Sequence, residues 1–311
     1  MAALIFLPNL LWQRAHGFPF LEMQRQFALG KNVVLSPLDF LMAQVQLLNP
    51  AAFPLWLGGI CFFFTRRGGP WRALGWTWIV AFLFFLVHKG TKTYLLTPAF
   101  IMLFASGAVF FEEYIDSARA AGRRLQWLGR AYLGLVLAVG ALYAPLTICL
   151  LPPQQFIAYV KTTGLRLPAV ETRKEGPLPM MYADMFGWPE MTEKVATYYN
   201  SLPAEERAKT AILGGSYGEC GAINLFGPRH GLPRAIGPHM NYWIWGPRDY
   251  TGESVIIVGV NADLLHTRFD RLDKVADLDH PYAMPHRNLP IWHCRRPKTD
   301  MQTVWPQLKV Y

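Results

Sequence analysis

Charged residues are absent from four long stretches in the first half of the chain. Residues 40–64, 73–87, 94–111 and 131–151 contain no Asp, Glu, Lys, Arg or His. With their flanks these stretches approach or exceed the roughly 20 residues that a helix needs to cross about 30 Å of hydrocarbon. Residues 152–311 contain no comparable stretch. The sequence therefore predicts a polytopic α-helical membrane bundle followed by a soluble domain.

The amino terminus is apolar but short. Residues 1–11 cannot cross the hydrocarbon at a rise of about 1.5 Å per residue, and they lack the basic start and the small-residue cleavage site of a signal peptide. Two interpretations stay open, an interfacial segment or a truncated helix that begins before Met1, and we expect the second. Four full spans are expected after it, at 37–64, 71–88, 94–112 and 125–151.

Acidic residues are scarce in the membrane half. Residues 1–151 hold 12 Lys+Arg against 5 Asp+Glu, and residues 152–311 hold 18 against 16, so the formal net charge of +9 divides into +7 and +2. A nucleic-acid binder needs a basic stripe on a soluble domain, which this distribution does not provide. A surplus in membrane loops fits contact with lipid head groups.

The arginines indicate an orientation. Membrane proteins concentrate positive charge in their cytoplasmic loops. Seven arginines lie in the loops after the first and third expected spans: Arg66, Arg67, Arg72, Arg119, Arg123, Arg124 and Arg130. We therefore expect these loops to be cytoplasmic, which places residues 152–311 and the loops 12–36 and 88–93 on the opposite face.

Cysteine and closely spaced histidine are both rare. The four cysteines, Cys61, Cys149, Cys220 and Cys294, form no CxxC motif, and the last two leave open a disulfide in the tail. Histidines are scattered, and the pair His286 and His293 is seven positions apart, so a zinc site is not expected.

Short apolar runs in the tail are typical of buried strands. Residues 209–214 and 253–259 are rich in β-branched residues and end in glycine. The glycine-rich segment 214–221 matches neither GxGxxG nor GxxxxGK[ST], which favours a tight turn over a nucleotide site. Strands alternating with helices predict an α/β domain over 152–311. The expected helices are 188–200, 217–226 and 261–269.

An aromatic segment, 241–248, stands out in the tail. It contains Tyr242, Trp243, Trp245 and Arg248. Aromatic rings beside an arginine suit contact with a sugar ring. The same residues also suit a packed core or a lid on the membrane, and the sequence leaves both interpretations open.

Short motifs along most of the chain carry a family resemblance. In the membrane half they are Leu7-Pro8-Asn9, Trp12-Gln13, His16-Gly17-Phe18-Pro19, Asn32-Val33-Val34-Leu35-Ser36-Pro37 and Lys92-Thr93-Tyr94-Leu95-Leu96-Thr97-Pro98. In the tail they are residues 182–188, 216–219 and 226–232. Together they resemble the carboxy-terminal portion of bacterial family 39 glycosyltransferases, relatives of the dolichyl-phosphate-mannose protein mannosyltransferases.

The resemblance implies a partial GT-C fold in the bacterial inner membrane, with the tail outside the cytoplasm. Such an enzyme transfers a sugar from a polyprenyl-phosphate carrier to a lipid, glycan or protein acceptor, and a divalent metal is left open as a cofactor. The family's catalytic acidic residue, the general base that activates the acceptor, lies in a loop after the first membrane helix. Glu22 and Asp39 do not fit that motif, so we expect this chain alone to be inactive.

The resemblance also implies site residues. Lys89, Lys92 and Tyr94 are candidates for binding the carrier phosphate, because ammonium groups just outside the hydrocarbon neutralise phosphate well. Alternatively, the two lysines simply extend towards the lipid interface. Candidate sugar or acceptor contacts are His16, Tyr217, Glu219, Tyr242, Trp243, Trp245 and Arg248.

Two rival classes of function have different sequence requirements. A transporter normally carries ionisable residues inside its membrane helices, and the four uncharged stretches have none. A membrane-anchored carbohydrate-binding or assembly protein without catalytic activity stays open as the alternative, since it would need only a sugar-binding surface on the tail.

Overall fold

A computed structural model describes residues 2–28, 32–88, 92–120 and 126–311 of the chain. The chain divides into two compact units, Met1–Thr172 and Arg173–Tyr311. We call them the helical unit and the α/β unit. The sequence suggested a boundary after residue 151, and the observed boundary lies later in the chain, after Thr172. The reason is that the segment before Thr172 returns to the helical unit, where the Val33 amide donates to the Val170 carbonyl at 3.3 Å.

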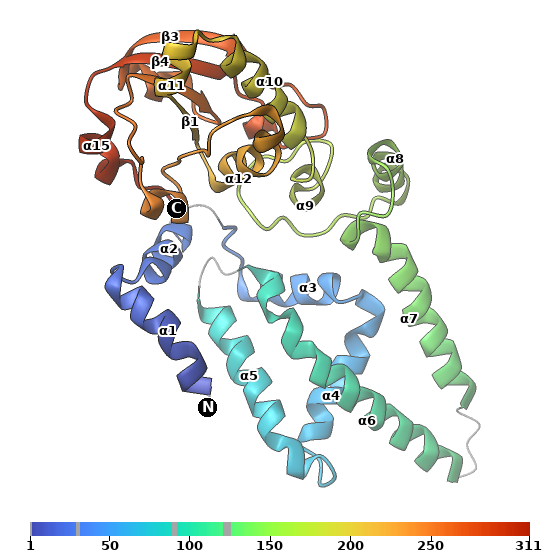
Figure 1. Cartoon of the computed structure of the whole chain (residues 1–311). Coiled ribbons are helices and arrows are strands. Elements are labelled where there is room, and N and C mark those ends of the chain that lie inside the picture. Colours follow the sequence, from blue (N-terminus) through green and yellow to red (C-terminus); the bar gives the residue numbers. More distant parts are fainter. Residues whose placement is uncertain (1, 29–31, 89–91, 121–125) are drawn as a thin grey trace. The chain divides into compact units, whose positions relative to one another are not determined.

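The helical unit is built from α-helices joined by short 3-10 helices (Figure 1). Its α-helices are α1 (Ala2–Ala15), α2 (Pro19–Ala28), α3 (Pro37–Leu47), α4 (Phe53–Phe63), α5 (Arg72–Val87), α6 (Ile101–Ala120), α7 (Gln126–Thr147) and α8 (Pro153–Thr163). Its 3-10 helices are η1 (Pro50–Ala52), η2 (Gly69–Trp71) and η3 (Thr93–Phe100).

Among the described residues, three helical segments are long and apolar enough to cross a membrane: Gly69–Val87, Thr93–Ala120 and Trp127–Thr147. The expected span at 37–64 consists of two helical segments, Pro37–Leu47 and Pro50–Phe63, which are apolar enough together but bent by 103°, as in a broken span or a re-entrant loop. Asn49 and Pro50 cause the break. Asn49 has a φ of 69° and its side chain caps the Ala51 amide at 3.1 Å, while Pro50 has no N–H to continue a helix.

The span Thr93–Ala120 begins as a 3-10 helix and ends eight positions later than the predicted residue 112. Its first eight residues form η3, and Pro98 lies inside them. Proline has no N–H to donate to the preceding turn, which favours a locally altered helix. A 3-10 segment of this length is uncommon and often marks strain or a functional site. Lys92 immediately precedes η3.

Aromatic packing and glycines hold the helical unit together. The Trp56, Trp78 and Phe100 rings lie 5.3–6.2 Å apart at the centre of its core. Helices α4 and α6 approach closely at two glycines. A Cβ atom added to Gly59 would lie 2.0 Å from the Leu103 carbonyl oxygen, and one added to Gly107 would lie 2.0 Å from that of Leu55. Small residues allow such close contact between membrane helices.

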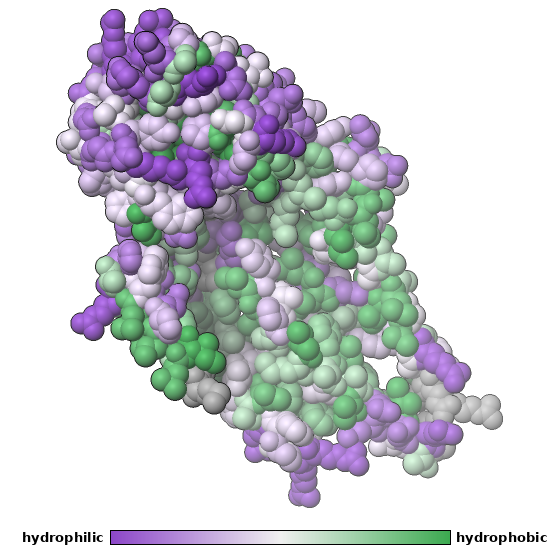
Figure 2. All heavy atoms as spheres, viewed as in Figure 1, coloured by the Kyte–Doolittle hydropathy of each residue, from purple (hydrophilic) through white to green (hydrophobic). Residues whose placement is uncertain are grey.

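The outer surface of the helical unit is apolar. Val80 and Val87 on α5 and Leu137 on α7 are 62–78% exposed. On the face drawn in Figure 2, hydrophobic residues cover much of this unit, while hydrophilic residues dominate the surface of the α/β unit. A soluble protein rarely exposes so large an apolar surface. Together with the three apolar helical segments, this surface indicates a membrane protein.

The α/β unit contains a small mixed sheet with helices (Figure 1). Its strands are β1 (Thr210–Gly214), β2 (Ser254–Val258), β3 (Phe269–Ala276) and β4 (Ile291–Pro297). Its α-helices are α9 (Met180–Ala183), α10 (Trp188–Ser201), α11 (Ala204–Lys209), α12 (Tyr217–Phe226), α13 (Asn241–Trp245), α14 (Ala262–His266) and α15 (Met301–Val304). Its 3-10 helices are η4 (Gly227–His230), η5 (Pro285–Arg287) and η6 (Trp305–Leu308).

The strand order is β1-β2-β4-β3, with β1 and β2 parallel and the other pairs antiparallel. Successive residues of β1 and β2 point alternately into two apolar cores, one on each face of the sheet. Ile212 and Ile256 belong to the core that also contains α10 and α12, whereas Leu213 and Ile257 belong to the core that contains α15 and η6. Both faces of the sheet are therefore covered, which explains why β1 and β2 are buried at every position.

The predicted α/β class agrees with this unit, but two strands were missed. Strands β1 and β2 and helices α10 and α12 lie close to their expected ranges, and α14 is shorter than expected. Strand β3 lies at the edge of the sheet and carries Asp270, Arg271 and Asp273, so its sequence shows no apolar run. Charged residues are a common protection of edge strands.

The cysteines are all free thiols. Cys220 and Cys294 are fully buried, and they belong to different apolar cores. The disulfide that the sequence left open between them is therefore not formed.

Candidate functional site

Lys92 is a largely buried charged residue of the helical unit. Its ammonium group donates a hydrogen bond to the Glu171 Oε1 atom at 2.8 Å. It also lies 5.9 Å from the centre of the Tyr94 ring. The two paired side chains are only 19% and 9% exposed. The sequence predicted Lys92 and Tyr94 as neighbours but gave no sign of Glu171, which lies 79 positions later.

The electrostatics keep Lys92 charged. Burial lowers the pKa of its ammonium group, but the hydrogen bond and the charge of Glu171 outweigh this effect, and the net pKa is raised above 10.5. An ammonium group has three N–H donors. The Lys92 ammonium group therefore keeps N–H donors that are not used by its bond to Glu171. Lys92 is the first residue before the apolar span Thr93–Ala120.

Two other candidates from the membrane half are less informative. Lys89 lies outside the described residues. His16 follows α1, where its Nδ1 atom lies 2.8 Å from the Trp12 carbonyl oxygen and its ring stacks on the Trp12 ring at 4.4 Å. These local contacts orient the imidazole relative to its own helix.

The aromatic segment around α13 divides into packed and exposed rings. Trp243 and Trp305 each donate an indole N–H to the other's carbonyl oxygen at 2.9 Å, and the Lys309 ammonium lies 4.5 Å from the Trp243 ring. These contacts make Trp243 a packing residue. Trp245, by contrast, is 61% exposed and packs edge-on against Tyr242 at 4.8 Å.

Arg248 and Tyr242 differ in burial. Arg248 is exposed and has a φ of 55°. The Tyr242 hydroxyl accepts a hydrogen bond from the Asn224 amide at 3.0 Å. Burial raises the pKa of Tyr242, although the Asn224 hydrogen bond opposes the shift. Of the residues predicted in this segment, Trp245 and Arg248 present the most accessible side chains.

Glu219 and Tyr217 stand at the start of α12. Glu219 is buried and closes a capping box, in which its Oε2 atom accepts from the Ser216 amide at 2.9 Å. Such a box satisfies amides that the first helical turn leaves unpaired. Tyr217 is 52% exposed, and its ring stacks on His239 at 5.0 Å. Glu219 thus has a structural role whatever else it contacts.

A pocket of about 170 Å³ lies beside Glu219. Trp188, His280 and Arg287 also line it. The Arg287 guanidinium lies 4.2 Å from the centre of the Trp188 ring and donates to the Asp184 carboxylate at 2.9 Å. Burial lowers the pKa of Arg287, which Asp184 and Glu219 oppose. Its Nε atom is buried and has no hydrogen-bond partner among the residues that the structure describes.

The sequence did not predict this pocket. Trp188 and Glu219 lie in motifs that carried the family resemblance, but His280 and Arg287 lie in a segment without any recognisable motif. Nothing local indicates that residue 287 reaches residue 219, since the chain must first pass through β2 and β3. The mixture of a carboxylate, a guanidinium, an imidazole and an indole suits a small polar ligand.

No group of three or more His, Cys, Asp or Glu side chains is placed to hold a metal ion within residues 2–28, 32–88, 92–120 and 126–311. Comparison of the chain with models of protein families, with curated protein sequences and with solved structures finds no match. The resemblance to family 39 glycosyltransferases therefore rests on the sequence motifs alone.

Proposed function

We propose that this chain acts in the transfer of a sugar from a polyprenyl-phosphate carrier to an acceptor outside the cytoplasm. Lys92 binds the carrier phosphate, and the α/β unit lies on the side of the membrane where the acceptor is. The sequence motifs that resemble those of family 39 glycosyltransferases support the reaction class. The observation that carries the proposal is the charged Lys92 at the first position before an apolar span.

The chemistry of Lys92 suits a lipid-linked phosphate. The carrier's hydrocarbon chain lies in the bilayer, so its phosphate lies at the depth where apolar spans end. An ammonium group of raised pKa is protonated at neutral pH and donates charge-assisted hydrogen bonds to phosphate oxygens. Glu171 holds this group in place, which reduces the conformational freedom lost on binding.

The test is the binding of a polyprenyl phosphate, and of the matching polyprenol, to the full chain in lipid nanodiscs. Lys92→Ala should weaken phosphate binding by about 1.5–3 kcal/mol, or roughly ten- to a hundredfold, and leave polyprenol binding unchanged. Lys92→Arg should restore binding only in part, because a planar fork does not replace a compact ammonium group. Lys161→Ala, which removes an exposed lysine of α8, is the matched control.

Glu171→Gln separates a binding role from a structural one. It keeps the Lys92 ammonium but removes the competing negative charge, so phosphate binding should strengthen while the fold weakens slightly. If Lys92→Ala and Lys161→Ala both leave phosphate binding within twofold of the parent chain, Lys92 does not bind the carrier and the proposal fails.

A second function is favoured by one observation. The exposed Trp245 ring, supported edge-on by Tyr242, is the kind of platform on which a sugar ring stacks. A membrane-anchored carbohydrate-binding or assembly protein would use this surface without catalysis. Binding of envelope glycans that Trp245→Ala abolishes, together with no preference for polyprenyl phosphate over polyprenol, would favour this alternative.

A further inference from the structure

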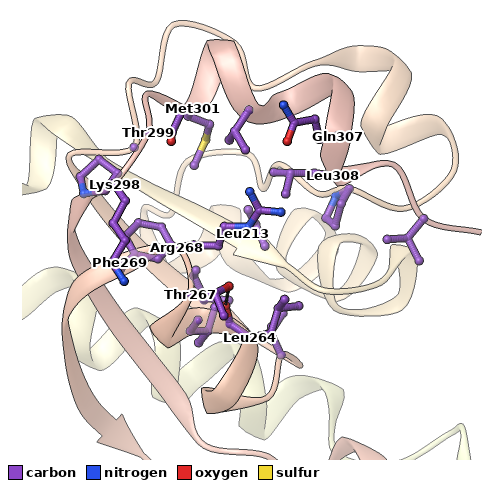
Figure 3. A pocket seen from close by; sticks show the side chains of 18 of the residues that line it. Leu213, Leu264, Thr267, Arg268, Phe269, Lys298, Thr299, Met301, Gln307 and Leu308 are labelled. Atoms are coloured by element: carbon purple, nitrogen blue, oxygen red, sulfur yellow. Dashed lines mark hydrogen bonds between the residues drawn. The ribbon is translucent and has the colours of Figure 1, made fainter.

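An apolar pocket of about 280 Å³ lies within the α/β unit, on the face of the sheet that carries Leu213 and Ile257. Figure 3 shows Met301 and Leu308 on one side of it and Leu264 and Thr267 on the other, with Leu213 between them. The sheet, α14 and the carboxy-terminal segment thus supply its walls. The volume is close to the lower end of the range for small-molecule sites, about 300 Å³.

A single arginine enters this apolar space. Arg268 follows α14, and Figure 3 shows its side chain extending into the pocket from beside Thr267 and Phe269. It is half-buried, and within the described part of the chain no side chain or carbonyl group pairs with its guanidinium. Lys298, at the rim, is already engaged, because it donates to the His266 carbonyl at 2.8 Å.

The charged residues that line the pocket are all basic, and the nearby Asp270 carboxylate lies 3.9 Å from the Lys298 ammonium group. Arg268, Lys298 and Lys309 line the pocket, and the described lining residues include no Asp or Glu. The lining therefore favours an anion with a hydrocarbon body. A guanidinium matches carboxylate and phosphate groups with two parallel hydrogen bonds, and these bonds are stronger where water is excluded.

We propose that this pocket binds a single-chain amphipathic anion, an alkyl chain that carries a carboxylate or phosphate head group. Arg268 binds the head group, and the side chains of Leu213, Leu264 and Met301 contact the chain. At about 30 Å³ per water-sized group, the volume holds roughly nine groups, which corresponds to a head group and about six to eight carbons. The residues that line this site all belong to the α/β unit, and the proposal does not depend on sugar transfer.

The experiment uses the full chain in lipid nanodiscs and octanoate that carries a diazirine near its tail carbon. Irradiation should attach the probe to pocket residues such as Met301 and Leu264, as mapped by mass spectrometry. Unlabelled octanoate or octyl phosphate should prevent the labelling, and octanol should do so poorly. The more effective of the two anions identifies the preferred head group. Each methylene between butanoate and octanoate should raise the affinity about fourfold.

The matched variants are Arg268→Gln and Arg234→Gln, which remove one positive charge each. Arg234 is exposed and does not line the pocket. Arg268→Gln should lower octanoate affinity roughly tenfold or more and leave octanol unchanged, whereas Arg234→Gln should stay within twofold of the parent chain. Arg268→Lys, which keeps the charge, should retain part of the affinity, and equal melting temperatures verify folding.

Three results would overturn the proposal. They are labelling that maps outside the pocket, equal competition by octanol and octanoate in the parent chain, and equal affinities for the two glutamine variants. The comparison of octanol with octanoate needs no variant, so it tests the anion preference even if a substitution disturbs folding.

Discussion

The Lys92 ammonium group lies 2.8 Å from the Glu171 carboxylate, joining the start of an apolar span to a residue 79 positions later. Together with the hydrogen bond from the Val33 amide to the Val170 carbonyl, this pair ties the segment before Thr172 to the helical unit. It also makes Lys92 a charged group of defined position rather than a freely moving interfacial lysine. The proposed phosphate site depends on that difference.

Removing either partner of this pair should destabilise the helical unit. Lys92→Ala takes the ammonium from a carboxylate that is only 9% exposed, and a loss of about 1–3 kcal/mol is expected. The double variant Lys92→Ala with Glu171→Ala should lose less than the sum of the single variants. Unfolding in detergent micelles measures all three. Additivity within about 0.5 kcal/mol would mean that the pair does not stabilise the fold.

The contact between α4 and α6 should not tolerate a methyl group. Gly107→Ala places its Cβ atom 2.0 Å from the Leu55 carbonyl oxygen, so the helices must separate, and a destabilisation of about 1–3 kcal/mol is expected. Gly134→Ala in α7 is the control, because nothing lies within 4 Å of its added atom. Thermal melts in detergent should show a lower midpoint for the first variant only. Equal midpoints would contradict the close packing.

The α/β unit should lose stability as the pH falls below about 6.5. His293 is fully buried and hydrogen-bonded to Ser254 at 2.7 Å and to Tyr198 at 2.9 Å. Burial lowers its pKa from 6.5, helped by Arg295 and opposed by Glu206. Below pH 6.5 the unfolded chain takes up a proton that the folded chain binds only at lower pH, so the free energy of unfolding decreases.

Hydrogen exchange of the β2 and β4 amides between pH 7.5 and 5 measures this effect. His293→Gln should flatten the pH dependence of the opening free energy, although it lowers stability at neutral pH. His266→Gln, which changes an exposed histidine, should preserve the pH dependence. An unchanged slope in His293→Gln would assign the pH dependence to other groups.

Cys220 and Cys294 should resist thiol reagents until the α/β unit unfolds. Burial raises the pKa of each thiol to about 12, so almost no thiolate forms at pH 7.5. Maleimide should therefore modify exposed Cys149 first and the two buried cysteines only in denaturant. Mass spectrometry of labelled peptides distinguishes them. Rapid native labelling of either buried cysteine, or a disulfide between them, would show that the cores open readily.

The orientation proposed from the arginines predicts the behaviour of a topology reporter. A reporter that is active only outside the cytoplasm should be active when fused after Tyr311 and silent when fused near Gly68 or Gly122. The loop near Gly68 contains Arg66, Arg67 and Arg72, and positive loops remain cytoplasmic. The reverse pattern of activity would place Lys92 and the α/β unit on the cytoplasmic side. It would then contradict the proposal that the acceptor lies outside the cytoplasm.

Several elements could be predicted because a local pattern encodes them. Apolar length predicted spans at 71–88, 94–112 and 125–151, and the structure has apolar helical segments at Gly69–Val87, Thr93–Ala120 and Trp127–Thr147. Runs of β-branched residues indicated β1 and β2, since both faces of these strands are buried. The bend between α3 and α4 was missed because composition does not distinguish a proline that breaks a span from one, such as Pro145, that a helix contains. Strand β3 was missed because an edge strand needs no apolar run.

The amino-acid sequence by itself determined the division into a helical apolar part and an α/β part, because hydrophobic length and periodicity are properties of neighbouring residues. Only the tertiary structure decided that Lys92 meets Glu171, that Arg287 reaches the pocket beside Glu219, and that Arg268 enters an apolar space. Each of these relationships joins side chains from segments far apart in the chain. Their distances depend on how the intervening helices and strands pack, which no local pattern specifies.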